Sequence, residues 1–137
     1  AEHLPGYAVD GIDISQAMLD QAAAKGLYRN RICADLTQIL PIADESYGGF
    51  VSSGTFTHGH VGPEVFPELL RVARPGALFV CGVIPPVFDG AGFGSRLALF
   101  TAHGMITPVS FHDIPIYENA DHDHAQDRGL VMVFRTL

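Results

Sequence analysis

Residues 7–26, YAVDGIDISQAMLDQAAAKG, contain the transition that decides the fold of this chain. The part from Tyr7 to Ile14 is short, mostly apolar and rich in β-branched residues, which is typical of a buried strand. Ser15 then offers an N-cap, apolar residues recur at helical spacing from Gln16 to Lys25, and Gly26 offers a stop. The stretch therefore predicts a strand that leads directly into a helix.

The same alternation of strands and helices continues along the chain. The run ALFVCGVI at 77–84 is almost wholly apolar, the pattern of a parallel strand covered on both faces. We expect further strands at 31–34, 49–53, 107–114 and 130–136, helices within 63–73 and near 95–103, and a Gly- and Pro-rich loop at 85–94. The fold class is therefore α/β: a three-layer, doubly wound and mostly parallel sheet whose last two strands form an antiparallel C-terminal edge.

The composition is that of a packed globule. A chain of 137 residues with 47% hydrophobic and 17% charged residues can build one sizeable core, so we expect a single domain over residues 1–137. The net charge of -7 with only 8 Lys and Arg leaves no basic stripe to neutralise phosphates. Nucleic acid and anionic membrane surfaces are therefore not expected as partners, and a small-molecule substrate is favoured.

The sequence also indicates a compartment. No stretch approaches the roughly 18 apolar residues of a membrane helix, and no basic and apolar leader opens the chain. Cys33 and Cys81 each lie in an apolar run without metal-site spacing, so both are predicted to be core thiols rather than a disulfide. These features favour a soluble protein of the reducing cytoplasm.

Two acidic residues follow successive predicted strands. In a doubly wound sheet the ligand lies outside the carboxyl ends of the strands. Asp13, in GIDIS, can accept hydrogen bonds from both hydroxyls of a ribose there, or can act as a local cap of the next helix. Asp35, in CADL, can accept from the exocyclic amine of adenine, or can be an ordinary turn residue. Together the pair suits an adenosine if both side chains emerge at one rim.

Two histidine motifs raise a metal-site alternative. HGH contains His58 and His60, and HDH spans residues 122–124. Imidazole and carboxylate groups are suitable ligands for zinc or iron, but three or four of them must converge. Nothing in the sequence brings the two loops together, so exposed loop histidines are the favoured interpretation and no metal is predicted.

A series of motifs within residues 9–83 carries a resemblance to a known family. GIDIS, AMLDQAAAKG, CADL, LPIADESYGGFVSSG and PELLRVARPGALFVCGV resemble, in order and spacing, the Rossmann-like class I S-adenosylmethionine-dependent methyltransferases. The stretch GTFTHGHVGPEVFPELLRVARPGALF looks like the methyltransferase-like proteins of the Williams-Beuren syndrome region. GIDIS alone also occurs where dehydrogenases bind a ribose, but several motifs in register are much stronger.

The resemblance implies S-adenosylmethionine as the cofactor. It assigns a set of cofactor contacts: the ribose at Asp13, the adenine beside Ile14, Met18, Asp35 and Leu36, and the methionine part at Ser53 and Gly54. His58 lies in the loop that approaches the methyl group in this family. There it would orient the substrate or take its proton, as the catalytic candidate, unless it merely packs against the loop.

The departure from the family lies at its beginning. The first strand and the GxGxG loop of the family have no counterpart, because this chain starts where the following helix ends. The domain is therefore expected to be N-terminally truncated, with open inner edges on the GIDI and GGFVS strands, and a homodimer through that open sheet edge is one consequence. This segment alone is expected to bind the cofactor weakly or not at all.

The leading hypothesis is methyl transfer to an O, N or S atom of a small molecule. Expected loop positions suggest four apolar residues as substrate-binding pocket walls: Phe56, Val87, Phe88 and Phe93. Two alternatives stay open: a noncatalytic binding or interaction domain on a degenerate methyltransferase fold, and a nucleotide-dependent oxidoreductase that uses the same ribose carboxylate. The sequence upstream of this chain would discriminate among the three.

Overall fold

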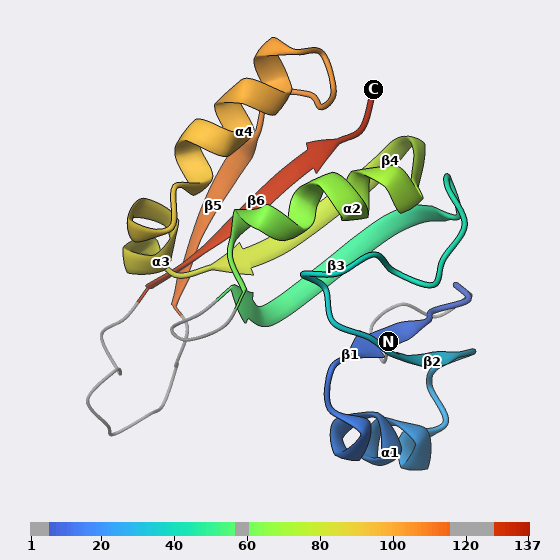
Figure 1. The fold of residues 1–137 in the computed structure, drawn as a ribbon. Coiled ribbons are helices and arrows are strands. Elements are labelled where there is room, and N and C mark those ends of the chain that lie inside the picture. Colours follow the sequence, from blue (N-terminus) through green and yellow to red (C-terminus); the bar gives the residue numbers. More distant parts are fainter. Residues whose placement is uncertain (1–5, 57–60, 116–127) are drawn as a thin grey trace. The chain divides into compact units, whose positions relative to one another are not determined.

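The computed structural model describes residues 6–56, 61–115 and 128–137 (Figure 1). Contacts within the chain gather into two compact units, residues 1–41 and residues 42–137, called unit 1 and unit 2 below. Each unit holds strands paired into a sheet and at least one helix. This confirms the mixed α/β, Rossmann-like fold class, whereas the single domain stays a prediction.

Unit 1 is built on two parallel strands joined by a helix. β1 (Gly11–Asp13) pairs with β2 (Arg31–Cys33), and their register sets Asp13 opposite Cys33. Just before β1, the Asp10 carboxylate accepts hydrogen bonds from Arg29 Nε at 3.0 Å and Nη2 at 2.8 Å. This bidentate pair ties the entry to β1 to the turn before β2, and so helps to align the two strands.

The connecting helix α1 (Gln16–Lys25) begins and ends where the local sequence predicts. Ser15 Oγ accepts a hydrogen bond from the Met18 amide at 3.3 Å and caps the first turn. Gly26 has a φ of 65°, a left-handed conformation that favours glycine and ends the helix. Leu19 is buried, which fixes the inward side of α1.

Unit 2 carries the longer strands and most of the helices. Its elements in chain order are β3 (Tyr47–Phe56), a 3-10 turn (Pro63–Val65), α2 (Phe66–Val72), β4 (Ala73–Val83), α3 (Pro85–Gly90), α4 (Phe93–Ala102), β5 (Ser110–Pro115) and β6 (Arg128–Arg135). Pro67 stands in the first turn of α2, where the missing amide hydrogen costs nothing. The regular helix is therefore short and follows the 3-10 turn, as the position of this proline predicts.

The four strands of unit 2 lie in the order β3-β4-β6-β5. β3 and β4 are parallel, whereas β6 is antiparallel to both of its neighbours, β4 and β5. This confirms the antiparallel C-terminal pair at the sheet edge. The reversed strand, β6, is not the outermost one: it lies between β4 and β5. The outermost strand, β5, therefore runs in the same direction as β4.

One face of this sheet packs against the helices and forms the core. Along β4, Ala77, Phe79, Cys81 and Val83 are buried while the intervening residues are only half-buried. Helices α2, α3 and α4 lie on one side of the sheet (Figure 1), where the rings of Phe56, Phe66, Phe93 and Phe134 contact one another across the elements. Burying such a ring stabilises the fold by about 1.5–3 kcal/mol.

Helix α3 corrects the expectation of a loop over 85–94. Pro85 and Pro86 open it, and proline is preorganised for the first turn of a helix because its φ is fixed near the helical value. The Val87 and Phe88 amides donate to the Ile84 carbonyl at 3.1 and 3.0 Å. The prolines and glycines that suggested a loop instead begin α3 and separate it from α4, with Gly92 at a φ of 78°.

The two cysteines differ in environment. Cys81 is buried as predicted, and burial raises the pKa of its thiol to about 12. The same prediction is wrong for Cys33, which is exposed because it ends a strand that pairs only with β1 in the described structure. No helix among the described residues is long and apolar enough to cross a membrane.

Candidate functional site

The candidate cofactor site of unit 1 is the rim at the carboxyl ends of β1 and β2. Asp13 is the last residue of β1, and its carbonyl accepts a hydrogen bond from the Ala34 amide at 3.0 Å. Asp35 follows Ala34 directly and lies two residues beyond the end of β2. Because the strands are parallel, the structure brings both carboxylates to the same end of adjacent strands, as the adenosine hypothesis requires.

Each carboxylate is partly held by its own turn. Asp13 Oδ1 accepts from the Ser15 amide at 2.9 Å, and Asp35 Oδ1 accepts from the Thr37 amide at 2.9 Å and hydroxyl at 2.6 Å. The Thr37 hydroxyl, and then its amide, lower the pKa of the Asp35 carboxyl below its ordinary value. Within the described residues Oδ2 of both carboxylates accepts no hydrogen bond and stays available to a ligand.

Apolar side chains flank this rim. Ile14 is 68% exposed and Met18 is 53% exposed, although both are large hydrophobic residues. Leu36, beside Asp35, is half-buried. Exposed apolar groups next to two acceptors can cover a flat heterocycle whose edge donates hydrogen bonds.

In unit 2 the predicted methionine contacts lie in the last part of β3. Ser53 is exposed, and both Ser53 and Gly54 lie within an irregularity of the pairing with β4, between Ser52 and Phe56. His58 lies outside the described residues, as do the other members of the histidine motifs, His60, His122, Asp123 and His124. Among the residues that are described, no group of three or more His, Cys, Asp or Glu can hold a metal ion.

The four predicted pocket walls do not lie on loops. Phe56 ends β3 and Phe93 begins α4, and both rings are completely buried, 5.2 Å apart between centroids. Val87 and Phe88 lie half-buried on α3, where Phe88 stacks on Phe93 at 5.9 Å. The loop argument for these residues is therefore wrong, because hydrophobic packing draws two of them into the core; their role in substrate binding stays a prediction.

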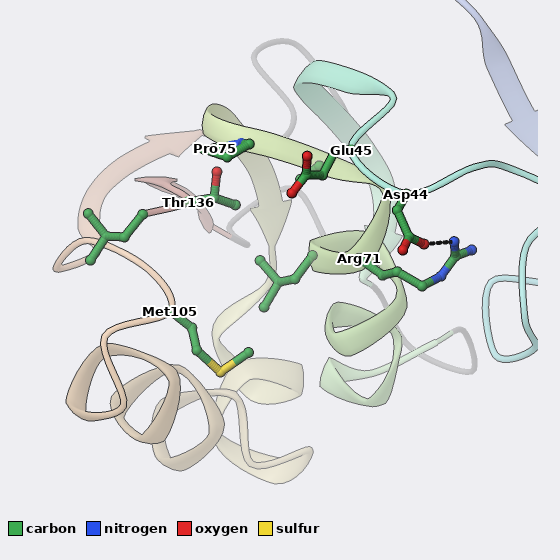
Figure 2. Close-up of a pocket in the computed structure, with 9 residues that line it drawn as sticks. Asp44, Glu45, Arg71, Pro75, Met105 and Thr136 are labelled. Carbon is green, nitrogen blue, oxygen red and sulfur yellow. Dashed lines mark hydrogen bonds and ion pairs between the residues drawn. The ribbon is translucent and has the colours of Figure 1, made fainter.

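The sequence did not reveal a pocket of about 350 Å³ at the other end of unit 2 (Figure 2). It lies at the amino ends of β3 and β4, and it is lined by Asp44, Glu45, Leu70, Arg71, Ala73, Pro75, Met105, Thr136 and Leu137. These residues are far apart in the sequence, and their spacing gives no signal that they meet. Ligands of parallel sheets lie at the opposite, carboxyl ends, so we do not assign the chemistry to this pocket.

Arg71, which lines this pocket, holds two carboxylates, those of Asp44 and Glu68. Its guanidinium forms an ion pair with Asp44 at 2.6 Å, a second one with Glu68, and donates to the Ile42 carbonyl at 2.9 Å. Hydrogen bonds to Glu68 and Asp44 raise the pKa of Arg71 above its ordinary value. The cluster therefore fastens the segment before β3 to α2.

Comparison with protein families and curated proteins gives two matches. A family described as a methyltransferase domain matches residues 1–81. Human methyltransferase-like protein 27 is 37% identical over 79 residues, which cover 56% of this chain and 31% of the human protein. The match thus spans about a third of the length of that relative.

Similar solved structures agree in fold. An S-adenosylmethionine-dependent methyltransferase from Methanosarcina mazei has a TM-score of 0.63 at 15% identity, covering 96% of this chain and 83% of that one. The CurJ carbon methyltransferase has a TM-score of 0.64 at 14% identity, covering 98% and 43%. The cyclase SpnF has a TM-score of 0.64 at 17% identity, covering 94% and 66%. At these identities the likeness shows the fold alone.

Proposed function

This chain belongs to the methyltransferase domain family, and from that membership we propose that the protein transfers a methyl group from S-adenosylmethionine to a small-molecule acceptor. The observation that carries the proposal is the shared rim of Asp13 and Asp35 at the carboxyl ends of two adjacent parallel strands. One nucleoside can meet both carboxylates there. A family match over residues 1–81 covers the same rim.

The proposal gives each part of an adenosine a contact in unit 1. Asp13 Oδ2 would accept from the ribose hydroxyls while Oδ1 keeps its bond to the Ser15 amide. Asp35, whose pKa is lowered by the hydrogen bonds from Thr37, would accept from the exocyclic amine of adenine. The exposed side chains of Ile14 and Met18 would cover the ring.

When bound, S-adenosylmethionine supplies an electrophilic methyl group on a positively charged sulfur. Transfer needs the acceptor atom, the methyl carbon and the sulfur in line in a dry site, so positioning provides most of the rate. Ser53 and Gly54 would flank the methionine part, and His58 would orient the acceptor or take its proton.

A small acceptor fits the charge of the chain better than a nucleic acid does. The net charge of -7 opposes nucleic acids and anionic membranes. Of the four apolar candidates, Val87 and Phe88 are the ones whose side chains are only half-buried and so can meet a substrate. Phe56 and Phe93 are buried and would contribute indirectly, because Phe93 stacks on Phe88 and Phe56 packs against Phe93.

Asp13→Ala tests the cofactor site in the full-length protein by calorimetric titration with S-adenosylmethionine. Losing hydrogen bonds to a charged acceptor should weaken binding about 10- to 100-fold. Asp20→Ala is the matched control, because Asp20 lies on exposed α1 and bonds only Gln16 in the described structure. Unchanged affinity in Asp13→Ala would contradict the proposal.

A noncatalytic binding domain is the second candidate, because one fold can carry many functions and the fold alone does not require transfer. A turnover assay with S-adenosylmethionine, run beside the titration, separates the candidates. A domain that has lost the reaction would bind the methyl donor without turnover, or would not bind it. A nucleotide-dependent oxidoreductase would bind a nicotinamide dinucleotide in preference.

A further inference from the structure

A network of hydrogen bonds lies at the amino ends of β1 and β2, at the opposite end of these strands from the proposed cofactor rim. The Asp10 carboxylate accepts from Arg29 Nε at 3.0 Å and Nη2 at 2.8 Å, and its Oδ1 also accepts from the Asn30 amide at 3.1 Å and side-chain amide at 3.3 Å. The side chain of Asp10 is 5% exposed, whereas that of Arg29 is 55% exposed. The turn before β2 thus holds a nearly buried carboxylate, and these hydrogen bonds are called the Asp10 clamp below.

The ring of Tyr28 extends this contact to the first residue of β1. A Cβ atom on Gly11 would lie 3.2 Å from Tyr28 Cδ1, so the ring lies against the glycine. Gly11 also donates its amide hydrogen to the Asn30 carbonyl at 2.9 Å. Three successive residues before β2, Tyr28, Arg29 and Asn30, therefore fit against two successive residues, Asp10 and Gly11.

The strands themselves do little to specify their register. β1 and β2 have three residues each, all of them half-buried or exposed. The register of a strand is strongly specified where one of its faces is buried, and weakly specified elsewhere. Backbone hydrogen bonds form equally well after a shift, so they do not select one register. A side chain that fits only one turn, as Asp10 does, selects it.

We infer that Asp10 is a positioning residue for the proposed cofactor site: the Asp10 clamp selects the register of β1 against β2 and thereby sets the position of Asp35 relative to Asp13. This inference rests on the proposed function, because it concerns the two carboxylates that would meet the adenosine. Asp13 lies three residues after Asp10, and Asp35 lies five residues after Asn30. Asp10 acts through the strands rather than by touching the cofactor.

The rim is sensitive to this register. Residues of a strand rise about 3.3 Å each, so a shift by one residue moves Asp35 by about 3.3 Å relative to Asp13. The same shift turns the side chains of β2 to the opposite face of the pair. A hydrogen bond holds its donor and acceptor within about 3.2 Å. Because the ribose and the adenine are joined in one nucleoside, they cannot follow such a shift, and one carboxylate loses its ligand atom.

Asp10→Ala tests the inference through the selectivity of the site for adenine. The measurement is a ratio of two calorimetric dissociation constants: that of S-inosylhomocysteine, which carries an oxygen in place of the exocyclic amine, over that of S-adenosylhomocysteine. In the wild type this ratio should be about 10–100, because Asp35 accepts from the amine and meets only an acceptor in the analogue. In Asp10→Ala the ratio should fall toward unity, since Asp35 no longer faces the base.

The ratio separates positioning from a loss of folded protein. A variant that is only partly folded loses affinity for both ligands by the same factor, because both apparent dissociation constants rise with the unfolded fraction. An unchanged ratio in Asp10→Ala, with or without weaker binding, would overturn the inference. Arg29→Ala is the second variant, since it removes the guanidinium of the clamp from an exposed position. Its ratio should also fall, and a wild-type ratio there would contradict the clamp.

Asp44→Ala is the matched control, because it removes an aspartate–arginine ion pair of unit 2, with Arg71 at 2.6 Å. This variant should keep the wild-type affinity and ratio, and an equal fall in it would contradict a role specific to the clamp. The proposed function fails separately. Unchanged binding in Asp13→Ala, with a wild-type ratio near unity, would remove the cofactor site itself. Weaker binding in Asp13→Ala beside an unchanged ratio in Asp10→Ala would remove only the role of the clamp.

Discussion

At the scale of single residues, each rim carboxylate combines a structural bond with a free oxygen. Asp13 and Asp35 both use Oδ1 to hold a turn, through Ser15 and Thr37 respectively. The turn interpretation and the ligand interpretation of these residues are therefore compatible. The turns keep the two charges at the rim before any ligand arrives, which lowers the cost of ordering them on binding.

Thr37→Val should raise the pKa of Asp35 toward its ordinary value of 3.8, because the hydroxyl bond is the larger cause of the lowering. A lowered pKa contributes stability above the unfolded pKa, and this stability is lost as the pH falls through the folded pKa. The variant should therefore show a weaker pH dependence of stability in this acidic range. Carboxyl NMR titration measures the pKa, and Thr37→Ser, which keeps a hydroxyl, should resemble the wild type. An unchanged pKa in Thr37→Val would refute this role.

At the scale of elements, α1 shows how much of a helix local sequence specifies. Ser15 and Gly26 bound it as the sequence predicts, and its inward side is fixed by Leu19. The helix bears on the proposed cofactor site because its first turn follows Asp13 and carries Met18. A loose first turn would move Met18 relative to Asp13 and Asp35.

Ser15→Ala should lower the free energy of unfolding of unit 1 by about 1 kcal/mol, because the Met18 amide loses its cap. Urea denaturation followed by helix circular dichroism measures this change. Ser95→Ala is the control, since Ser95 is exposed on α4 and caps no helix there. Equal effects of the two substitutions would mean that the cap contributes nothing.

Other elements depended on partners that the sequence does not name. The strand pattern of the sequence predicts β5 and β6, but it does not predict the strand order, in which β6 lies beside β4. Likewise the sequence predicts Phe56 and Phe93 as pocket walls, whereas the packing of β3 against α4 buries both rings. The residues lining the pocket of Figure 2 come from four separate stretches of the sequence.

At the scale of the whole molecule, the two units differ in the size of their hydrophobic cores. Among the described residues, the buried hydrophobic side chains of unit 1 are Leu19 and Leu40, and all the others belong to unit 2. A unit with so small a core has little to resist local opening. The proposed cofactor rim therefore lies in the unit with the smaller core.

Native-state hydrogen exchange of residues 1–137 should show α1 amides opening at a lower free energy than those of β4, with rates at least about 100-fold faster. The central position of β4, paired on both sides, and the buried face of β4 are the reason. Identical protection in the two elements would instead mean one cooperative domain, as first expected from chain length. Binding of S-adenosylmethionine should slow the exchange of the α1 amides selectively.

The order of residues by itself determined the alternation of strands and helices, the cap and stop of α1 and the placing of Asp13 and Asp35 at strand ends. Each of these depends on neighbours within a few positions, where propensity and periodicity act. Only the tertiary structure decided that β6 lies between β4 and β5, that Cys33 is exposed, and that Phe56 and Phe93 are core. Burial is a property of whatever covers a residue, and the covering elements come from distant parts of the chain.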